Sequence, residues 1–296
     1  MASVINRLDG LGLINPPAWL PNNTMFEGWT GSVAYGASND SSDMDIIGFC
    51  MPPKDLVFPH LSGEITGFGQ QVQRFDQFQQ HHIEDKSSKK EYDLTIFSIV
   101  KFVQLAMENN PNMVDNLFLP RRCVLHSTAI YEHIRSNRKK FLHKGSYYKF
   151  RGYAMSQMSK INKGANRSNP KRQISIDKFG FDVKFAYHVV RLLLEAEQIM
   201  STGDLRLDRD SEVYKSIRRG EWSLDRINEW FEEKEKSLET LYANSSLPER
   251  PNEDEIKKIL IECMEMHYGS LKEAMVEKDK HSRLVRELEE LVKKHQ

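Results

Sequence analysis

Two aspartates that are separated by one residue follow a Gly-Ser pair near the start of the sequence. Gly31-Ser32 is followed by ten residues and then by Asp43-Met44-Asp45, after which hydrophobic residues continue to Phe49. Side chains at positions i and i+2 of a strand lie on the same face, so both carboxylates can approach one divalent cation. Mg²⁺ prefers oxygen ligands and usually takes one or two carboxylates together with substrate phosphates. The pattern therefore predicts a metal site that acts on a phosphorylated substrate.

The Gly-Ser pair has the composition of a phosphate-binding turn. A glycine lets the backbone come close to a triphosphate, and backbone N–H groups and the Ser32 hydroxyl can bind its oxygens. A third carboxylate on a neighbouring strand would complete a two-metal site, in which one ion activates the attacking hydroxyl and the other holds the leaving pyrophosphate. The alternative is that Ser32, Asp43 and Asp45 are ordinary turn residues after a strand.

The order Gly-Ser, spacer and Asp-hydrophobic-Asp-hydrophobic resembles the DNA polymerase β nucleotidyltransferase superfamily, although Thr30 stands where that superfamily has a hydrophobic residue. Within it, the sequence resembles the group called RlaP, predicted nucleotidyltransferases that are associated with RNA ligases and RNA repair. The similar stretches, from about residue 28 to about residue 235, include Gly31-Ser32-x-Ala34-Tyr35-Gly36, Ser42-Asp43-x-Asp45, Gly48-Phe49, Tyr92-Asp93-Leu94, Asn110-Pro111-Asn112 and Lys149-Phe150-Arg151-Gly152-Tyr153.

The resemblance implies a nucleotidyltransferase fold that requires Mg²⁺ and an NTP, with ATP as the expected nucleotide. It also implies that Asp93 is the third carboxylate, so that Asp43, Asp45 and Asp93 are the expected catalytic and metal-binding residues. Asp76 is a rival for the third position. The alternative for Asp93 is the N-cap of the helix that follows it.

The expected fold class is an α/β (α+β) nucleotidyltransferase head with a mixed sheet, followed by a helical body. Strand, turn and strand are expected over 25–60, with Thr30 to Ala34 before a polar loop; a hairpin or meander is expected over 64–84, and a strand over 91–96 feeds a helix that Asn110-Pro111 ends. Helical periodicity covers 127–143, 146–162, 180–202, 223–243, 252–267 and 270–294. The predicted domains are a catalytic head at 1–120 and a helical body at 121–296.

A polar stripe on the predicted helix 180–202 suits a nucleotide that lies between head and body. Lys184, His188, Arg191 and Glu195 share one helix face. Arg191 could neutralise phosphate bidentately. The predicted nucleotide-binding residues are therefore Gly31, Ser32, Tyr35, Lys184, His188 and Arg191. The alternative is an exposed helix face with a local Arg191–Glu195 ion pair.

The net charge of zero conceals a basic segment. Residues 121–176 hold 14 Lys and Arg against the single acid Glu132, whereas both flanks are acidic. Such a segment can attract a polyanion, unless neighbours in the fold offset its charges. Aromatic residues are interleaved with the basic ones, as in RNA-binding surfaces, although they could equally be core residues of helix 146–162. The predicted acceptor-binding residues are Lys149, Arg151, Lys163, Arg167, Lys171 and Arg172.

Other features are assigned no chemistry. The sequence lacks an apolar run long enough to cross a bilayer and a signal peptide, so we expect a cytoplasmic protein without membrane contact. Cys50, Cys123 and Cys263 are expected to be reduced thiols. His81-His82 is interpreted as hairpin surface, and the last helix, 270–294, is a candidate for packing or for homodimer formation.

The expected reaction is transfer of a nucleoside monophosphate from an NTP to an acceptor hydroxyl, with an RNA or tRNA 3′ end as the favoured acceptor. One alternative is nucleotidylation of a protein or a small molecule, as in toxin-type or antibiotic-modifying relatives. Another is a nucleotide-binding module without catalysis.

Overall fold

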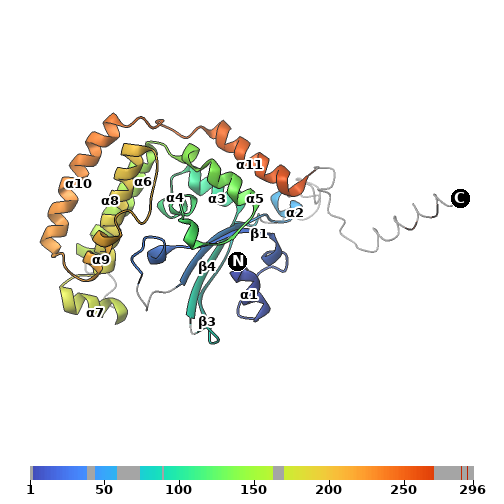
Figure 1. Ribbon diagram of the computed structural model, residues 1–296, viewed down its shortest axis with the longest axis horizontal. Coiled ribbons are helices and arrows are strands. Elements are labelled where there is room, and N and C mark those ends of the chain that lie inside the picture. Colours follow the sequence, from blue (N-terminus) through green and yellow to red (C-terminus); the bar gives the residue numbers. More distant parts are fainter. Residues whose placement is uncertain are drawn as a thin grey trace, which may run out of the picture.

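The structure, a computed structural model, describes residues 3–38, 44–58, 74–88, 90–162 and 170–269, together with Leu288 and Val292. The described residues form a five-stranded sheet in the order β3-β4-β2-β1-β5. The strands are β1 (Thr24–Trp29), β2 (Met44–Cys50), β3 (Gln77–Asp85), β4 (Lys90–Ser98) and β5 (Val124–Ser127). β2 and β4 pair in parallel and the other neighbours pair antiparallel, so the predicted mixed sheet is confirmed (Figure 1).

Two strands differ from the sequence prediction. The first strand ends at Trp29, and Gly31–Val33 forms a 3₁₀ turn, η2, because Gly31 adopts φ +64° and cannot continue an extended strand. Of the range 64–84, where a hairpin or meander is expected, residues 64–73 lie outside the described residues; β3 occupies the end of the range and forms a hairpin with β4. β4 alternates buried and half-buried residues from Glu91 to Ser98, so alternate side chains point into the core. This alternation determines the register in which a neighbouring strand can pair with β4.

The N-terminal helix α1 (Val4–Gly10) covers one face of the sheet, and a buried carboxylate on β1 anchors it there. Glu27 on β1 accepts hydrogen bonds from the backbone N–H groups of Val4 and Ile5 at 2.7 and 3.2 Å, and from the Ser3 hydroxyl. These are N–H groups that the first turn of a helix leaves without intrahelical partners. Ile5 and Leu8 then pack on the sheet in one hydrophobic cluster, which also includes Ile46, Leu94 and Ile96.

Replacing Glu27 by alanine should therefore loosen α1. Two backbone donors would lose their buried acceptor, which costs about 1–3 kcal/mol of unfolding free energy. Urea unfolding measures this loss. Glu84→Ala on the exposed side of β3 is the matched control, expected to change stability by less than about 0.5 kcal/mol. Equal midpoints for the two variants would show that Glu27 does not anchor the helix.

The opposite face of the sheet is covered by α3 (Ile99–Met107) and α5 (Ala129–Ser136); α11 (Glu253–Tyr268) packs on both of these helices, and α4 (Pro111–Leu117) packs on α3 (Figure 1). Ser98 caps α3 by accepting from the Lys101 N–H, so the alternative that Asp93 is the N-cap was wrong. The predicted break after α3 is confirmed: α3 ends at Met107, and Asn110 caps the next helix, whose first residue is Pro111.

The remaining long helices form a layer beside the sheet, where α6 (Gly145–Asn162), α8 (Val183–Thr202) and α10 (Leu224–Asn244) lie side by side (Figure 1). α7 (Pro170–Phe179) and α9 (Ser211–Arg218) pack against α8. Neither α7 nor α9 lies within the segments for which a helix was predicted. Short elements are η1 (Pro21–Asn23), α2 (Lys54–Val57), η4 (Arg121–Cys123) and η5 (Arg138–Phe141). The predicted helix 270–294 lies outside the described residues except for Leu288 and Val292.

One hydrophobic core joins the head to the helices. It runs from Phe26 and Phe49 in the sheet to Phe150 in α6 and Leu193 in α8 without a break at position 120. The division into two domains stays a prediction. Cys50, Cys123 and Cys263 are buried and form no disulfide. Among the described helices, none combines the length and the hydropathy that a membrane span needs.

Candidate active site

Asp45 and Asp93 lie opposite each other on the parallel strands β2 and β4. The register pairs these two residues directly, and both side chains are half-buried. Directly paired residues project from the same face of a sheet, and neighbouring strands are about 4.8 Å apart. Asp76 is not close to this position, because its carbonyl accepts from the Ser98 N–H, at the other end of β4. The structure therefore brings Asp45 together with Asp93 and separates Asp76 from them.

The Gly-Ser turn lies against Asp45. The Thr30 N–H donates to the Asp45 carbonyl at 2.9 Å, and a Cβ placed on Gly31 would come within 2.5 Å of Asp45 Oδ2. Only glycine fits here, since the position has a positive φ as well as this close approach. Ser32 follows directly in η2 and is half-buried. The turn and the two carboxylates thus form one continuous patch.

The donor set of this patch suits a hard divalent cation. Two carboxylates with room for phosphate oxygens are what Mg²⁺ usually takes from a protein. The third expected carboxylate, Asp43, lies outside the described residues, and within the described part of the chain no group of three or more His, Cys, Asp and Glu side chains could hold a metal ion. The two described carboxylates, Asp45 and Asp93, fit as part of a Mg²⁺ site to which substrate phosphates would add further oxygen ligands.

A β-bulge that the sequence analysis did not foresee contacts Asp93. Between Gln80 and Ile83 the β3–β4 register shifts, so that His81 and His82 together oppose Asp93. The His82 N–H donates to Asp93 Oδ1 at 2.9 Å, and His81 Nδ1 lies 3.4 Å from the same oxygen. The interpretation of His81-His82 as plain hairpin surface misses this contact. Two adjacent histidines in an alternating strand are the only trace of it in the sequence.

Tyr35 and Arg191 are buried together rather than exposed to a ligand-sized space. The Arg191 guanidinium donates through Nη1 to the Tyr35 hydroxyl at 2.8 Å, to Asp115 Oδ2 at 2.8 Å and to Glu195 Oε2 at 2.9 Å. It also stacks over the Tyr35 ring, 4.3 Å from the centroid. The expected Arg191–Glu195 pair is present, but it is buried and not on an exposed face. The network fixes the turn after Gly31 to α8.

The charges in this network are costly to bury. Burial raises the pKa of Glu195 and of Asp115, and the Arg191 guanidinium opposes that increase. Burial also raises the pKa of Tyr35, which therefore stays a neutral donor; its hydroxyl donates to Asp115 Oδ2. Arg191 is thus committed to neighbours within the protein.

Two further arginines hold the same turn from outside. Arg122 Nη2 donates to the Ala34 carbonyl at 3.2 Å and Nη1 pairs with Asp208 at 2.9 Å. Arg218 in α9 donates to the Ala37 carbonyl. The turn residue Gly36 packs against the start of α9, since a Cβ there would lie 3.3 Å from that of Ser211. The helical body therefore determines the position of the turn.

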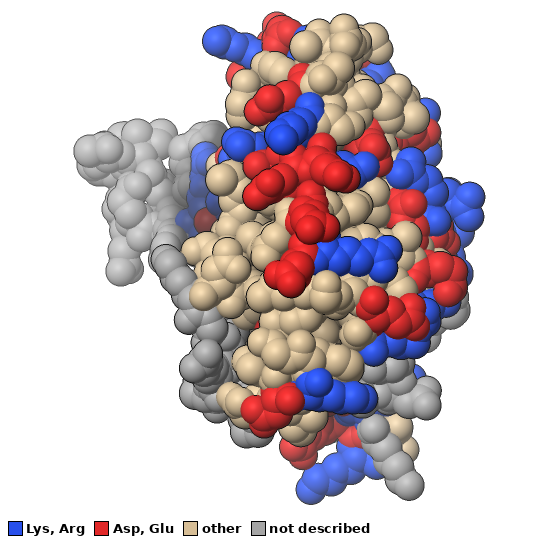
Figure 2. All heavy atoms as spheres, turned by 90° about the vertical axis from the view of Figure 1, so that its left-hand side faces the viewer, with Lys and Arg blue, Asp and Glu red and all other residues tan. Residues whose placement is uncertain are grey.

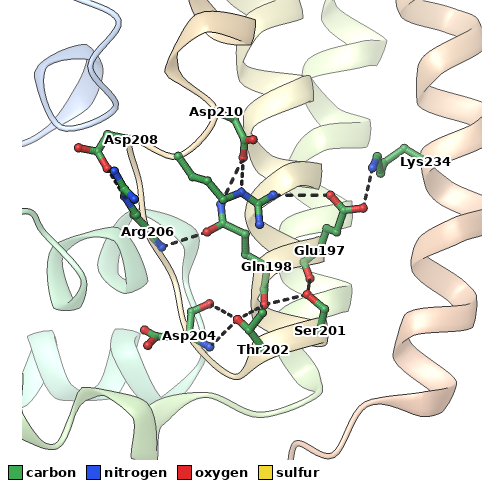
Figure 3. Close-up of polar contacts among 10 residues, drawn as sticks. Glu197, Gln198, Ser201, Thr202, Asp204, Arg206, Asp208, Asp210 and Lys234 are labelled. Atoms are coloured by element: carbon green, nitrogen blue, oxygen red, sulfur yellow. Dashed lines mark hydrogen bonds and ion pairs between the residues drawn. The ribbon is translucent and has the colours of Figure 1, made fainter.

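The loop that carries Asp208 is itself fixed by polar contacts, which Figure 3 shows. Gln198 in α8 accepts from the Arg206 N–H at 3.1 Å and donates to Asp210 at 3.4 Å. Thr202 caps the turn at the end of α8 by accepting from the Asp204 N–H at 3.2 Å. These contacts hold the α8–α9 connection in place next to the Gly31–Gly36 turn.

Lys184 and His188 complete the predicted stripe on α8. Lys184 is exposed near the helix start, which Asp182 caps. Burial, together with the positive charge of Arg191, lowers the pKa of His188 far below its usual range, so the ring is neutral near pH 7. Of the cations expected on this stripe, Lys184 is the one that faces solvent.

The basic segment is largely neutralised, mostly by acids that lie outside it in the sequence. Most of its described cations have an ion-pair partner at 2.5–3.9 Å: Arg121–Glu132, Arg122–Asp208, Lys139–Asp204, Lys140–Glu255, Lys144–Glu249, Lys149–Glu108, Arg151–Glu235 and Arg172–Asp182. Figure 2 shows the face formed largely by α10, where acidic side chains gather between basic ones. The alternative that neighbours offset these charges therefore applies to the described residues.

The predicted acceptor-binding residues lie in different environments in the structure. Lys149 is exposed, Arg151 is half-buried against Glu235, and Arg172 packs over the Phe185 ring at 4.5 Å. Lys163 and Arg167 lie outside the described residues, as does the side chain of Lys171. The interleaved aromatics divide as well: Tyr147 and Phe150 are core residues, whereas Tyr148 and Tyr153 are 59% and 40% exposed.

Comparison with known proteins identifies the family of the chain. No curated protein has a sequence that matches the chain. Among solved structures, a nucleotidyltransferase-like protein from Exiguobacterium sibiricum 255-15 is similar at 13% identity, over 95% of this chain and 84% of that one, with a TM-score of 0.27. Residues 18–262 match the family model described as RlaP, RNA repair pathway DNA polymerase beta family. Since that match spans most of the sequence, the chain belongs to the RlaP family of DNA polymerase β-type proteins of an RNA repair pathway.

Proposed function

We propose that this protein transfers a nucleoside monophosphate from an NTP, with ATP favoured, to an acceptor hydroxyl. The acceptor oxygen would form a bond to the α-phosphorus, the bond from that phosphorus to the bridging oxygen would break, and pyrophosphate would leave. The observation that carries the proposal is the direct pairing of Asp45 with Asp93 beside the Gly31 turn. Membership of a DNA polymerase β-type family supports it.

Asp43, Asp45 and Asp93 are the residues that would hold Mg²⁺. Bound there, the metal would supply Lewis-acid stabilisation of the charge that develops on the phosphate oxygens. Asp93 is the carboxylate on the outer strand, and we assign it to the acceptor hydroxyl, whose proton it would accept. Asp45 lies against the Gly31 turn, so we assign it to the NTP side.

The NTP phosphates would lie on the Gly31-Ser32 turn. Backbone N–H groups and the Ser32 hydroxyl are the donors, and Lys184, the exposed cation of the predicted stripe on α8, is the candidate cation. Tyr35 and Arg191 would support the turn from behind, since the Tyr35 hydroxyl and Arg191 Nη1 are used within the buried network. His188 would contribute shape but no charge, because its ring is neutral.

For the acceptor we favour an RNA end, such as a tRNA 3′ hydroxyl. The RNA repair pathway of the family supports this choice. Most described cations of the basic segment are held in ion pairs, so Lys163, Arg167 and Lys171 are the basic residues that we assign to RNA contact. A protein or small-molecule acceptor is the rival within the same chemistry, and a non-catalytic nucleotide-binding module is the rival in another class.

The salt dependence of RNA affinity tests the choice of acceptor. An RNA path should give a linear log–log decrease of affinity with salt, of slope about −0.7 for each phosphate neutralised on a single strand. Replacing Lys163, Arg167 and Lys171 by serine should flatten that slope by about 2 units. The matched control replaces Lys215, Lys257 and Lys258, which have acidic neighbours of their own, and should leave the slope unchanged. A shallow slope for the unaltered protein would reject RNA and leave nucleotidyl transfer standing.

A further inference from the structure

The edge strand β3 carries a backbone distortion at the position opposite Asp93. His82 adopts φ +55°, a left-handed conformation that costs a residue with a side chain about 1–2 kcal/mol. The β3–β4 register is regular on both sides of the shift between Gln80 and Ile83. The distortion is therefore a single bulge, and bulges recur next to active sites, where they re-aim side chains.

The bulge delivers two contacts to one carboxylate oxygen. The His82 N–H donates to Asp93 Oδ1 at 2.9 Å, and His81 Nδ1 approaches the same atom at 3.4 Å. Contacts concentrated on Oδ1 restrain rotation of the carboxylate and leave Oδ2 as the oxygen for a ligand.

Neighbouring glutamines determine which nitrogen of His81 carries the proton. The Gln79 amide nitrogen, which can only donate, lies 2.6 Å from His81 Nε2, so Nε2 accepts and the proton is on Nδ1, facing Asp93. Gln77 donates to Gln79 Oε1 at 3.2 Å, which keeps that amide in the same orientation. Gln77, Gln79 and His81 alternate along β3, so they lie on one face of the strand, with His81 Nδ1 3.4 Å from Asp93 Oδ1.

We propose that His81 is a positioning residue that orients the Asp93 carboxylate for its metal and acceptor roles, with Gln79 fixing its tautomer. The inference rests on the proposed function and goes beyond it, because the carboxylate set alone says nothing of what orients it. Outer hydrogen-bond partners of ligating carboxylates typically change metal affinity or activity by about 10–100-fold when they are removed. An ordinary surface histidine would have no such effect.

The test compares two substitutions at one position. His81→Leu removes the donor, and His81→Asn keeps an amide N–H close to the place of Nδ1. We expect His81→Leu to lower kcat by about 10–100-fold with little change in the KM for NTP, and His81→Asn to restore most of kcat. His133→Leu is the matched control, because His133 forms an imidazole–carboxylate contact with Glu262 at 2.8 Å on α5, outside the site. Unchanged kcat for His81→Leu, or equal losses for both His81 variants, would overturn the proposal.

Titration with Mn²⁺, followed by electron paramagnetic resonance, separates this inference from the proposed function. The expected result is Mn²⁺ binding by the unaltered protein, about 10-fold weaker binding by His81→Leu, and near-normal binding by His81→Asn and His133→Leu. Equal affinity for the unaltered protein and His81→Leu would overturn the positioning role alone. A protein that binds no Mn²⁺ in any form would overturn the proposed function and this inference with it.

Discussion

Asp45→Asn is expected to lower the rate of nucleotidyl transfer by about a thousandfold or more. The substitution keeps the size of the side chain and removes a negative charge that would hold Mg²⁺ beside the phosphates. Metal stabilisation of the transition state is worth several kcal/mol, and about 4 kcal/mol corresponds to about a thousandfold. Steady-state measurement of pyrophosphate release gives the rate. Asp43→Asn is expected to have an effect of the same order.

The fold should survive this change, since Asp45 lies on a strand whose backbone pairs on both sides with β1 and β4. Removal of one of several neighbouring carboxylates relieves repulsion, so Tm should be unchanged or slightly raised. Asp254→Asn, at a side chain that is 95% exposed on α11, is the matched control and should leave the rate unaltered. Near-normal turnover of Asp45→Asn with an intact fold would mean that the metal assignment is wrong.

Arg191→Met should produce the largest loss of stability. The substitution leaves Asp115 and Glu195 buried without their cation, and breaking a buried pair in this way costs about 3–5 kcal/mol. That corresponds to a decrease in Tm of about 10 °C. Urea unfolding measures the free energy. Arg121→Met is the matched control, because its ion pair with Glu132 is exposed and such pairs contribute about 0–1 kcal/mol.

The loss of unfolding free energy caused by Arg191→Met should depend on pH. Burial raises the folded-state pKa of Glu195 and Asp115, and loss of the guanidinium raises it further. A carboxyl whose pKa is higher in the folded state destabilises the fold as pH rises through that folded pKa, and the penalty disappears below the unfolded pKa of about 4. The difference between Arg191→Met and the unaltered protein should therefore narrow as pH falls from about 7 to about 5. A difference that widens toward acid would contradict the buried-carboxylate explanation.

The part of the site that was predictable is local in sequence. Asp45 and Asp93 each sit in a short alternating segment, and parallel pairing of those two segments is enough to place their carboxylates together. Gly31 was predictable for the same reason, since a glycine before Asp-hydrophobic-Asp signals a close backbone approach. The mixed sheet and most of the long helices follow from periodicity in the same way.

The roles that depend on distant partners could not be predicted. Helical periodicity predicts that Arg191 lies on the polar face of α8, but it does not predict that Arg191 is buried. The residues that bury it, Tyr35 and Asp115, come from segments more than 70 residues away. The basic segment looked like a polyanion site because its partners, such as Asp204 and Glu255, lie far along the chain. A bulge such as that at His81 and His82 depends on strand register, which residue types alone do not specify.

The position of the transferred label tests the central claim most directly. The protein is incubated with Mg²⁺, acceptor fractions of RNA, protein and small molecules, and ATP labelled at either the α- or the γ-phosphate. The proposal predicts that α-label enters one acceptor fraction and that γ-label leaves as pyrophosphate, with neither event for Asp45→Asn. Transfer of γ-label to an acceptor, or equal incorporation of α-label by the protein and by Asp45→Asn, would contradict it.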